Sequence, residues 1–261
     1  CAEAFVRALT EAGVPKGVVN LVCGAGEEAG AALVAHPLVR AISFTGSSET
    51  GALIGETCGR LHKRFSLEMG GKNAQIVMED ANLDLALEGA LWGAFGTTGQ
   101  RCTATSRLIL HKKIADEFVA RLRDRAAKLK LGDGLAEGVH VGPLVDETQR
   151  NRVREMVAVG AAEGATIALG GDDARGEGLD RGWFFKPTVL TGVRREMRVA
   201  REEIFAPVVG CLVVGSFEEA VETLNDTEYG LSSSIYTRDV DRAFRAIRDL
   251  EAGITYVNGP T

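Results

Sequence analysis

The sequence predicts an α/β protein whose core is a parallel sheet covered by helices, and two observations carry this prediction. Short apolar runs rich in β-branched residues alternate with longer runs of helical periodicity along the whole chain of 261 residues. The apolar runs are continuous, which is typical of strands buried on both faces. Parallel strands need a crossover between them, and a helix is the usual crossover.

In the first part of the chain, helices and strands alternate up to Glu68. Pro37 ends the second helix, and Ser47 or Ser48 can cap the third. The helices are expected at 2–12, at 27–35 and from the serine cap to about 58, and the strands at 18–22, 41–45 and 64–68.

After the Gly70-Gly71 pair the alternation resumes. Helices are expected at 83–96, 112–130, 147–163, 217–225 and 239–250. Strands are expected at 74–78, 106–110, 165–169, 187–191, 208–214, 232–236 and 253–257. Turn-rich stretches at 132–143 and 170–182 are expected to be loops. The glycine pair is expected to divide the chain into domains of residues 1–69 and 70–261.

Composition and charge argue against several classes of function. The net charge of -6 argues against binding to nucleic acid or to an acidic membrane surface. No run approaches the ~18 apolar residues of a membrane span, and no secretory signal pattern is visible. The five cysteines are widely spaced without a Cys-x-x-Cys pair, which fits free thiols in a reducing cytoplasm. The four histidines lack ligand spacing, so no metal site is expected.

Cys102 is the candidate nucleophile. Cys23, Cys58 and Cys211 are expected to be small buried side chains. Cys102 instead lies in a polar, glycine-containing turn just after a predicted helix. A thiolate in such a turn can attack a carbonyl carbon. A buried structural cysteine is the alternative, and the polar flank argues against it.

Glu68 is the candidate general base. It ends an apolar strand just before the Gly70-Gly71 pair. A carboxylate there can activate a water molecule that releases an acyl group from the thiol. A solvated surface charge is the alternative. Together, Cys102 and Glu68 describe covalent catalysis through a thioester.

Six motifs, in order, resemble those of the aldehyde dehydrogenase superfamily, whose members oxidise aldehydes to acids with NAD or NADP. They are Val18-Val19-Asn20-Leu21-Val22 with Gly24; Ile42-Ser43-Phe44-Thr45-Gly46-Ser47; Leu67-Glu68-Met69-Gly70-Gly71-Lys72-Asn73; Gly99-Gln100-Arg101-Cys102; Glu202-Glu203-Ile204-Phe205-Ala206-Pro207; and Val257-Asn258-Gly259-Pro260-Thr261. The resemblance implies that Cys102 forms a thiohemiacetal and then a thioester, and that Glu68 activates the deacylating water. It also implies a partial dinucleotide-binding domain at 1–69 and a catalytic domain at 70–261.

The resemblance implies a phosphate site for the cofactor at the start of a helix. Gly46 and Ser47 would bind the phosphate there, and Gly51 would keep the first helical turn slim. A simple N-cap at Ser47 is the alternative. The earlier turn at 24–26 follows a predicted strand, but its spacing departs from the dinucleotide fingerprint by one residue.

The resemblance also implies contacts to the nicotinamide end. Glu203 would accept the hydroxyl groups of the ribose, and Phe205 would position the nicotinamide ring. Gln149 would be a weaker ribose contact. The alternatives are a surface acid at Glu203 and a core phenylalanine at Phe205. Ala206 stands where the family usually has glycine.

Arg101 and Asn258 are the candidate substrate contacts. The segment 101–107 resembles members that act on acid semialdehydes, including 2-oxoglutarate semialdehyde, because a cation suits a substrate carboxylate. An Arg101 paired with a nearby acid is the alternative. Asn258 resembles a residue of the substrate tunnel, and a turn residue before Gly-Pro is the alternative.

Two other functions stay open. A coenzyme A-acylating semialdehyde dehydrogenase would use coenzyme A in place of water, although that branch usually lacks the acid at Glu68. A truncated relative would be a binding or structural unit. Family members extend further at both ends, and an oxyanion-binding asparagine and an adenosine-binding lysine precede this region. We therefore expect a piece of a longer, cytoplasmic enzyme, a homodimer or homotetramer, that acts on a small aldehyde.

Overall fold

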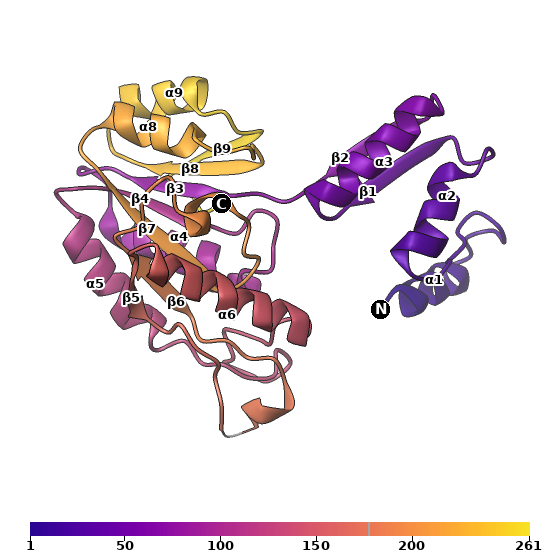
Figure 1. The fold of residues 1–261 in the computed structure, drawn as a ribbon, viewed down its shortest axis with the longest axis horizontal. Coiled ribbons are helices and arrows are strands. Elements are labelled where there is room, and N and C mark those ends of the chain that lie inside the picture. The colour runs from indigo at the N-terminus through magenta and orange to yellow at the C-terminus, as the bar shows by residue number, and fades with distance from the viewer. Residues whose placement is uncertain (177) are drawn as a thin grey trace. The chain divides into compact units, whose positions relative to one another are not determined.

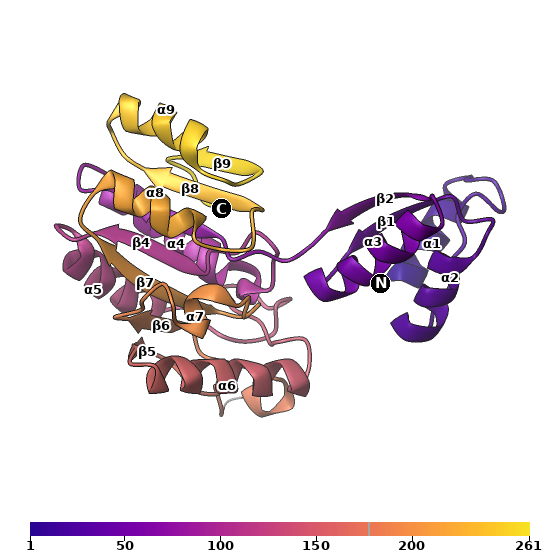
Figure 2. The ribbon, with the colours of Figure 1, turned by 45° about the horizontal axis from the view of Figure 1, so that its top comes forward.

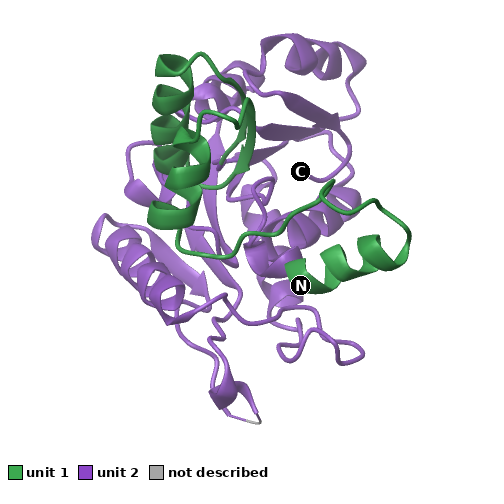
Figure 3. Cartoon of the chain, turned by 90° about the vertical axis from the view of Figure 1, so that its right-hand side faces the viewer, with its two compact units in different colours: residues 1–69 green, residues 70–261 purple. Residues whose placement is uncertain are grey.

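The computed structural model describes residues 1–176 and 178–261. The chain divides into two compact units, Cys1–Met69 and Gly70–Thr261, which Figure 3 shows in different colours. The boundary falls at the Gly70-Gly71 pair. Each unit has a sheet of its own, with two strands in unit 1 and seven in unit 2.

Unit 1 contains a short parallel sheet made of β1 (Ala41–Thr45) and β2 (Arg64–Glu68). The crossover between them is α3 (Ser48–Arg60). Ser47 is its N-cap, and the Ser47 hydroxyl accepts a hydrogen bond from the Thr50 backbone N–H at 3.2 Å. Both strands and the serine cap are therefore confirmed.

The rest of unit 1 is helical or irregular (Figure 1). It contains α1 (Ala2–Glu11) and α2 (Ala31–Ala35), and a π-helical turn at Gly26–Gly30 leads into α2. The strand predicted at 18–22 is wrong, because this segment is irregular and largely exposed. A strand needs a neighbour that supplies ladder hydrogen bonds, and no strand of the described residues pairs with 18–22.

Unit 2 is built on a sheet with the strand order β5-β6-β7-β4-β3-β8-β9. All neighbouring pairs are parallel except β5 and β6. The strands are β3 (Ala74–Val77), β4 (Arg107–His111), β5 (Thr166–Leu169), β6 (Thr188–Thr191), β7 (Val208–Val214), β8 (Ser232–Tyr236) and β9 (Ile254–Val257). Each strand predicted after the glycine pair is confirmed to within a residue at either end.

Helices cover both faces of this sheet, and the two layers can be followed in Figure 2. They are α4 (Leu83–Phe95) and α5 (Ala115–Ala126) on one face, and α6 (Glu147–Ala162), α8 (Phe217–Asn225) and α9 (Val240–Asp249) on the other. Successive side chains of a strand point to opposite faces. Leu108 and Leu110 of β4 therefore pack with α4 and α5, whereas Ile109 packs with α8 and α9.

A few short elements differ from the predicted pattern. The turn Gly96–Gly99 and α7 (Arg198–Arg201) are additional helical turns, and α5 is shorter than the predicted helix. The predicted loop at 170–182 contains one such turn at Leu179–Arg181, and its Glu177 lies outside the described residues. None of the helices in the described residues combines the length and apolar character that crossing a membrane requires.

The segments that carry the predicted chemistry of unit 2 enter the sheet at one edge. Residues 70–73 precede β3, residues 99–106 precede β4, and residues 202–207 precede β7. Because these strands are parallel, their amino ends lie at the same edge of the sheet. The topology therefore collects the Cys102 and Glu203 segments at the amino-terminal edge.

The buried hydroxyl of Tyr236 has no hydrogen-bond partner in the described residues, and it faces Gly89 on α4. A Cβ at Gly89 would overlap with this hydroxyl, so Gly89→Ala is expected to lower the free energy of unfolding by about 1–3 kcal/mol. Tyr236→Phe removes an unpaired polar atom and is expected to be neutral or stabilising. In the double variant the alanine penalty should shrink. Urea unfolding of the four proteins measures this, and equal penalties in both backgrounds would contradict it.

Candidate active site

Cys102 lies in a turn between α4 and β4, and its side chain is partly exposed. The Ala104 N–H closes the turn by donating to the Arg101 carbonyl at 2.9 Å. The Asn73 side chain donates to the Cys102 carbonyl at 2.7 Å and to the Ala104 carbonyl at 3.0 Å. Of the described residues, none accepts a hydrogen bond from the Cys102 backbone N–H. The peptide around the thiol is therefore fixed while this N–H stays available.

The backbone that leads into this turn is strained. Thr97, Thr98 and Gly99 have φ angles of 53°, 60° and 64°, a left-handed run that β-branched residues avoid. A Cβ at Gly99 would overlap with the Ala206 carbonyl, so only glycine fits there. The Thr98 hydroxyl accepts a hydrogen bond from the Gly142 N–H at 3.0 Å. Strain of this kind persists only where the surroundings determine it, and it is concentrated at functional sites.

Glu203 lies against residues 70–72, which we call the glycine strap. The Gly71 N–H donates to Glu203 Oε1 at 3.0 Å. A Cβ at Gly70 would overlap with the Glu203 carboxylate, and a Cβ at Gly71 would lie 2.8 Å from the Cys102 carbonyl oxygen. The strap therefore passes between the carboxylate and residues 101–104, which we call the cysteine turn. In the described residues only Gly71 donates to this carboxylate, so most of its acceptor sites are free.

Three side chains hold the backbone carbonyls of residues 202–205, which we call the acidic loop. Lys72 Nζ donates to the first carbonyl at 2.7 Å, and Arg152 donates to the second at 2.9 Å. The Gln149 amide donates to the third and fourth carbonyls at 2.8 and 3.0 Å. Phe205 has a φ angle of 57°, which a bulky residue adopts only under constraint. Gln149 and Phe205, both predicted cofactor residues, are thus in direct contact.

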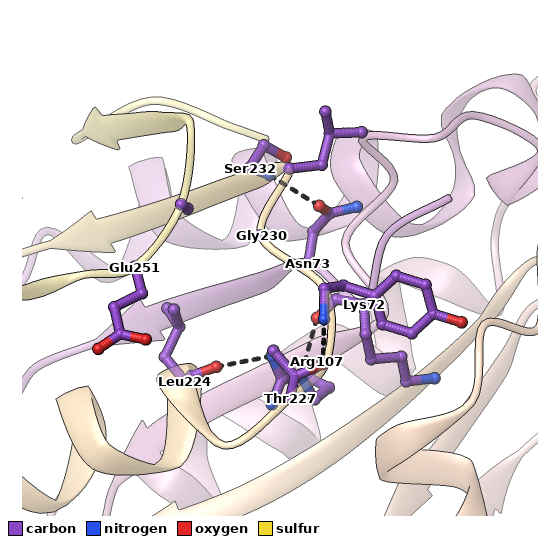
Figure 4. Close-up of a pocket in the computed structure, with 11 residues that line it drawn as sticks. Lys72, Asn73, Arg107, Leu224, Thr227, Gly230, Ser232 and Glu251 are labelled. Atoms are coloured by element: carbon purple, nitrogen blue, oxygen red, sulfur yellow. Dashed lines mark hydrogen bonds between the residues drawn. The ribbon is translucent and has the colours of Figure 1, made fainter. Parts of the chain in front are cut away.

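Two buried basic side chains, Lys72 and Arg107, lie behind the strap. Burial lowers the pKa of Lys72 to about 7, the Arg107 cation adds to this effect, and Glu203 and Glu202 oppose it. Arg107 donates to the Lys72 carbonyl at 2.9 Å and to the Leu224 carbonyl at 2.9 Å, and both bonds are drawn in Figure 4. It also donates to the Thr223 carbonyl at 3.0 Å, in the same last turn of α8. Burial lowers the pKa of Arg107 to about 10, so its guanidinium stays charged at neutral pH. A cavity of about 10 Å³ beside them has room for one water molecule.

Unit 1 contains four of the predicted site residues, Gly46, Ser47, Gly51 and Glu68. The Gly46 N–H donates to the Glu68 carbonyl at 3.0 Å, and the Glu68 side chain is exposed. A Cβ at Gly46 would overlap with the ring of the phenylalanine two residues earlier. Gly51 is buried, and a Cβ there would overlap with the Met69 sulfur. With Ser47 at the N-cap, both glycines keep the first turn of α3 free of side-chain bulk.

Arg101 is held by neutral groups. Its guanidinium lies 5.3 Å from the centroid of the Trp92 ring. It donates to the Thr103 hydroxyl at 2.9 Å and to the Thr261 carbonyl at 2.9 Å. No acidic side chain of the described residues forms an ion pair with it. The alternative in which a nearby acid neutralises Arg101 is therefore not what this structure shows.

Asn258 follows β9 and so lies at the carboxyl-terminal edge of the sheet, opposite the edge that carries Cys102. Its amide accepts from the Thr237 N–H at 3.1 Å and donates to the Thr237 carbonyl at 3.0 Å. Its φ angle of 52° is one that asparagine tolerates. These contacts are those of a turn residue, and a contact between Asn258 and substrate stays a prediction.

The remaining cysteines agree only in part with the expected burial. Cys58 and Cys211 are buried, and burial raises the pKa of Cys211 to about 12. Cys23 is exposed, so the prediction that it is buried is wrong. The reason is the irregular backbone around it, because Cys23 follows the segment that forms no strand.

Sequence reasoning does not single out Asn73, Lys72 or Arg152. The signal for the first two was their position, since polar residues at the entry to a buried strand must find hydrogen-bond partners. The signal for Arg152 was its spacing of three residues from Gln149, which places both on one helix face.

The lowered pKa of Lys72 makes stability depend on pH. Between about pH 7 and about pH 10.4 the unfolded lysine holds a proton that the folded lysine has lost, so this group makes the protein more stable as the pH rises. Lys72→Met should remove this slope, which is at most about 1.4 kcal/mol per pH unit. Chemical unfolding of both proteins from about pH 7 to about pH 9.5 measures it. A free-energy difference between them that is constant over this range would contradict the lowered pKa.

The chain matches known proteins over its whole length. Residues 1–261 match the aldehyde dehydrogenase family. The chain is 46% identical over 248 residues to the peroxisomal aminoaldehyde dehydrogenase 1 of Pisum sativum, and 42% identical over 257 residues to the betaine aldehyde dehydrogenase of Brucella anthropi. These alignments cover 95% and 98% of this chain but 49% and 53% of the relatives. The chain therefore spans about half the length of these curated relatives.

Solved structures share the fold. The crystal structure of betaine aldehyde dehydrogenase from Staphylococcus aureus in complex with NAD+ matches with a TM-score of 0.97 and 37% identity, over 100% of this chain and 52% of that one. The crystal structure of HpcC from Thermus thermophilus matches with a TM-score of 0.96 and 43% identity, over 100% of this chain and 51% of that one. These matches confirm the α/β fold, and the chain belongs to the aldehyde dehydrogenase family.

Proposed function

We propose that the protein to which this chain belongs oxidises a small aldehyde to a carboxylate with NAD or NADP, through a thioester on Cys102. The observation that carries the proposal is the geometry around this residue. A partly exposed thiol lies in a turn that Asn73 fixes, and the Cys102 N–H is free of any partner in the described residues. Membership of the aldehyde dehydrogenase family over the whole chain supports the same chemistry.

The first half of the reaction forms the thioester. The Cys102 thiolate attacks the aldehyde carbon, and the carbonyl π-electrons move onto oxygen. The free Cys102 N–H donates a hydrogen bond to this oxyanion and so stabilises its negative charge. When the negative charge on oxygen collapses, the carbon loses hydride and becomes a thioester. A nicotinamide held beside Glu203 and Phe205 would accept that hydride.

The second half releases the acid. Glu68 removes a proton from water, and the resulting hydroxide attacks the thioester carbon. The carbon–sulfur bond breaks and the thiolate is restored. An exposed carboxylate at the end of β2 is accessible to water, as this role requires.

The residues present fit a dinucleotide. Glu203 has free acceptor sites for ribose hydroxyls, because only Gly71 donates to its carboxylate in the described residues. Phe205 is 38% exposed, which leaves a ring face for the nicotinamide. Gly46 and Ser47 open a helix of 13 residues, whose N-terminus favours a phosphate. Gln149 holds the acidic loop in place, and this supports a role beside the ribose.

We infer further that the aldehyde carries a carboxylate. Arg101 adjoins the nucleophile, and its charge is not neutralised by an acid of the described residues. An uncompensated cation attracts an anionic substrate and repels an ammonium group. The curated relatives named above are called aminoaldehyde and betaine aldehyde dehydrogenases. The alternative to a carboxylate substrate is therefore an aldehyde with a cationic end.

We also propose that the whole protein is a homodimer or homotetramer of the cytoplasm. The free cysteines fit a reducing compartment. Relatives from Pisum sativum and Beta vulgaris are named as peroxisomal and chloroplastic enzymes, so fractionation of the source cells would test the location.

Substitution of the two catalytic residues in the full-length protein tests the mechanism. Cys102→Ser should abolish NADH formation from NAD+ and aldehyde, because a serine hydroxyl is a far weaker nucleophile without an adjacent base. Glu68→Gln should keep a rapid burst of about one NADH per site and lose steady-state turnover, because only deacylation is slowed. Stopped-flow absorbance without coenzyme A measures both.

Cys23→Ser is the control, since it removes an exposed thiol outside the site and should leave turnover unchanged. Normal turnover in Cys102→Ser would refute the mechanism. A requirement for coenzyme A in the wild type would point instead to the acylating reaction.

Arg101→Gln tests the substrate class. The wild type should prefer succinate semialdehyde to 4-aminobutanal, and the substitution should lower kcat/KM for succinate semialdehyde by about tenfold, the effect of one charged hydrogen bond. Butanal, which has no charged end, should be oxidised equally by both proteins. Arg181→Gln, at an exposed arginine, should change nothing. A wild type that prefers 4-aminobutanal would overturn the carboxylate proposal.

A further inference from the structure

Lys72 is a buried amino group that the proposed reaction does not use. Its side chain is 1% exposed, and its one hydrogen bond in the described residues goes to the Glu202 carbonyl at 2.7 Å. Removing an ammonium from water is costly, and a well-packed apolar side chain of similar size is often better tolerated. We therefore ask which local interaction accounts for a lysine at this buried position.

Lys72 and its neighbour Gly71 hold both ends of Glu203. The Glu202 carbonyl belongs to the peptide unit that begins Glu203, and Lys72 fixes it. The Gly71 N–H binds the carboxylate of the same residue at 3.0 Å. Lys72 therefore fixes the backbone at the start of Glu203, and Gly71 fixes the carboxylate at the end of its side chain.

The close packing around Glu203 leaves little freedom for the position of its carboxylate. A Cβ at Gly70 would overlap with the carboxylate, so the end of the Glu203 side chain lies close to the strap backbone. If the loop moved toward the strap, the carboxylate would have to turn away from its present orientation. If the loop moved away, the hydrogen bond from Gly71 would be lost. Lys72 spans the same gap from a buried position, and so it sets the separation of strap and loop.

Lys72 differs from the other side chains that hold the acidic loop. Arg152 is exposed, so a ligand can touch it directly. Lys72 is closed off from solvent, and any effect it has on a ligand must pass through the loop. Its amino group, with the pKa lowered by burial, is the kind of perturbed residue that collects at functional sites.

We propose that Lys72 is a positioning residue for the cofactor, which holds the Glu203 carboxylate in the orientation that receives the nicotinamide ribose. The inference rests on the proposed function, because it takes Glu203 as the ribose ligand. Without the Lys72 bond the first carbonyl of the acidic loop is unpaired, and the loop shifts to find another donor. The ribose contact weakens and the nicotinamide is less well placed for hydride transfer.

The test compares Lys72→Met, Lys72→Arg and Lys128→Met in the full-length protein. Lys128→Met makes the same chemical change at an exposed lysine. Calorimetry gives the NAD+ dissociation constant. The burst of nitrophenolate from p-nitrophenyl acetate reports acylation of Cys102, which needs no nicotinamide. Turnover with aldehyde deuterated at the carbonyl carbon reports whether hydride transfer limits the rate.

In Lys72→Met the NAD+ dissociation constant should rise by about tenfold or more. The nitrophenolate burst should be unchanged, and a deuterium isotope effect on kcat larger than that of the wild type should emerge. Lys72→Arg, which keeps a donor, should recover most of the affinity, and Lys128→Met should behave as the wild type.

Unchanged NAD+ affinity and isotope effect in Lys72→Met would overturn the proposal. Parallel loss of burst and affinity in both Lys72 variants would also overturn it, because Lys72 would then support the fold as a whole. A wild type without a burst or without NAD+ binding would refute the proposed function itself, which is a separate result.

Discussion

The Asn73 carboxamide is the contact on which the candidate site of unit 2 depends. Both of its N–H bonds go to carbonyls of the cysteine turn, and its oxygen accepts the Ser232 N–H at 3.0 Å. One buried side chain therefore joins the entries of β3, β4 and β8. An aspartate has no donors and a glutamine is longer by one carbon, so neither can make the same three bonds from this position.

Around this contact, backbone segments approach so closely that side chains are excluded. Gly71 passes the Cys102 carbonyl, Gly70 passes the Glu203 carboxylate, and Gly99 passes the Ala206 carbonyl. The cysteine turn, the glycine strap and the acidic loop are thus held by these close approaches together with the hydrogen bonds of Asn73, Lys72, Arg152 and Gln149. A site held in this way is preorganised, because these hydrogen bonds are already formed before a ligand binds.

The sequence predicts the sheet well because most of its strands contain a short apolar run between turn residues. The same signal fails at 18–22, where the composition suits a strand but no neighbour pairs with it. Composition reports what a segment can do, whereas a ladder also requires a partner. The glycine-containing turn around Cys102 is likewise visible locally, and its partly exposed thiol agrees with that interpretation.

The contacts and backbone conformations that hold the site could not be predicted from the sequence, for two physical reasons. First, the bonds of Asn73 join residues 29, 31 and 159 positions away, and no local pattern encodes such pairs. Second, Thr97, Thr98 and Phe205 adopt left-handed backbone conformations that their own side chains disfavour. Tertiary contacts impose these conformations, so residue preferences point away from them.

The turn that Asn258 and Thr237 form at the far edge of the sheet has a consequence for how this architecture can change. Asp80 accepts hydrogen bonds there from the Thr237 hydroxyl at 2.9 Å and from the Arg238 N–H at 2.8 Å, which fastens the exits of β3, β8 and β9 to one another. The connection after β9 leads from Asn258 to Thr261, whose backbone carbonyl and hydroxyl contact Arg101 and Thr105 beside the nucleophile. A change of length in that connection would therefore shift the contacts of Arg101, so the far turn and the cysteine turn constrain each other through one short segment.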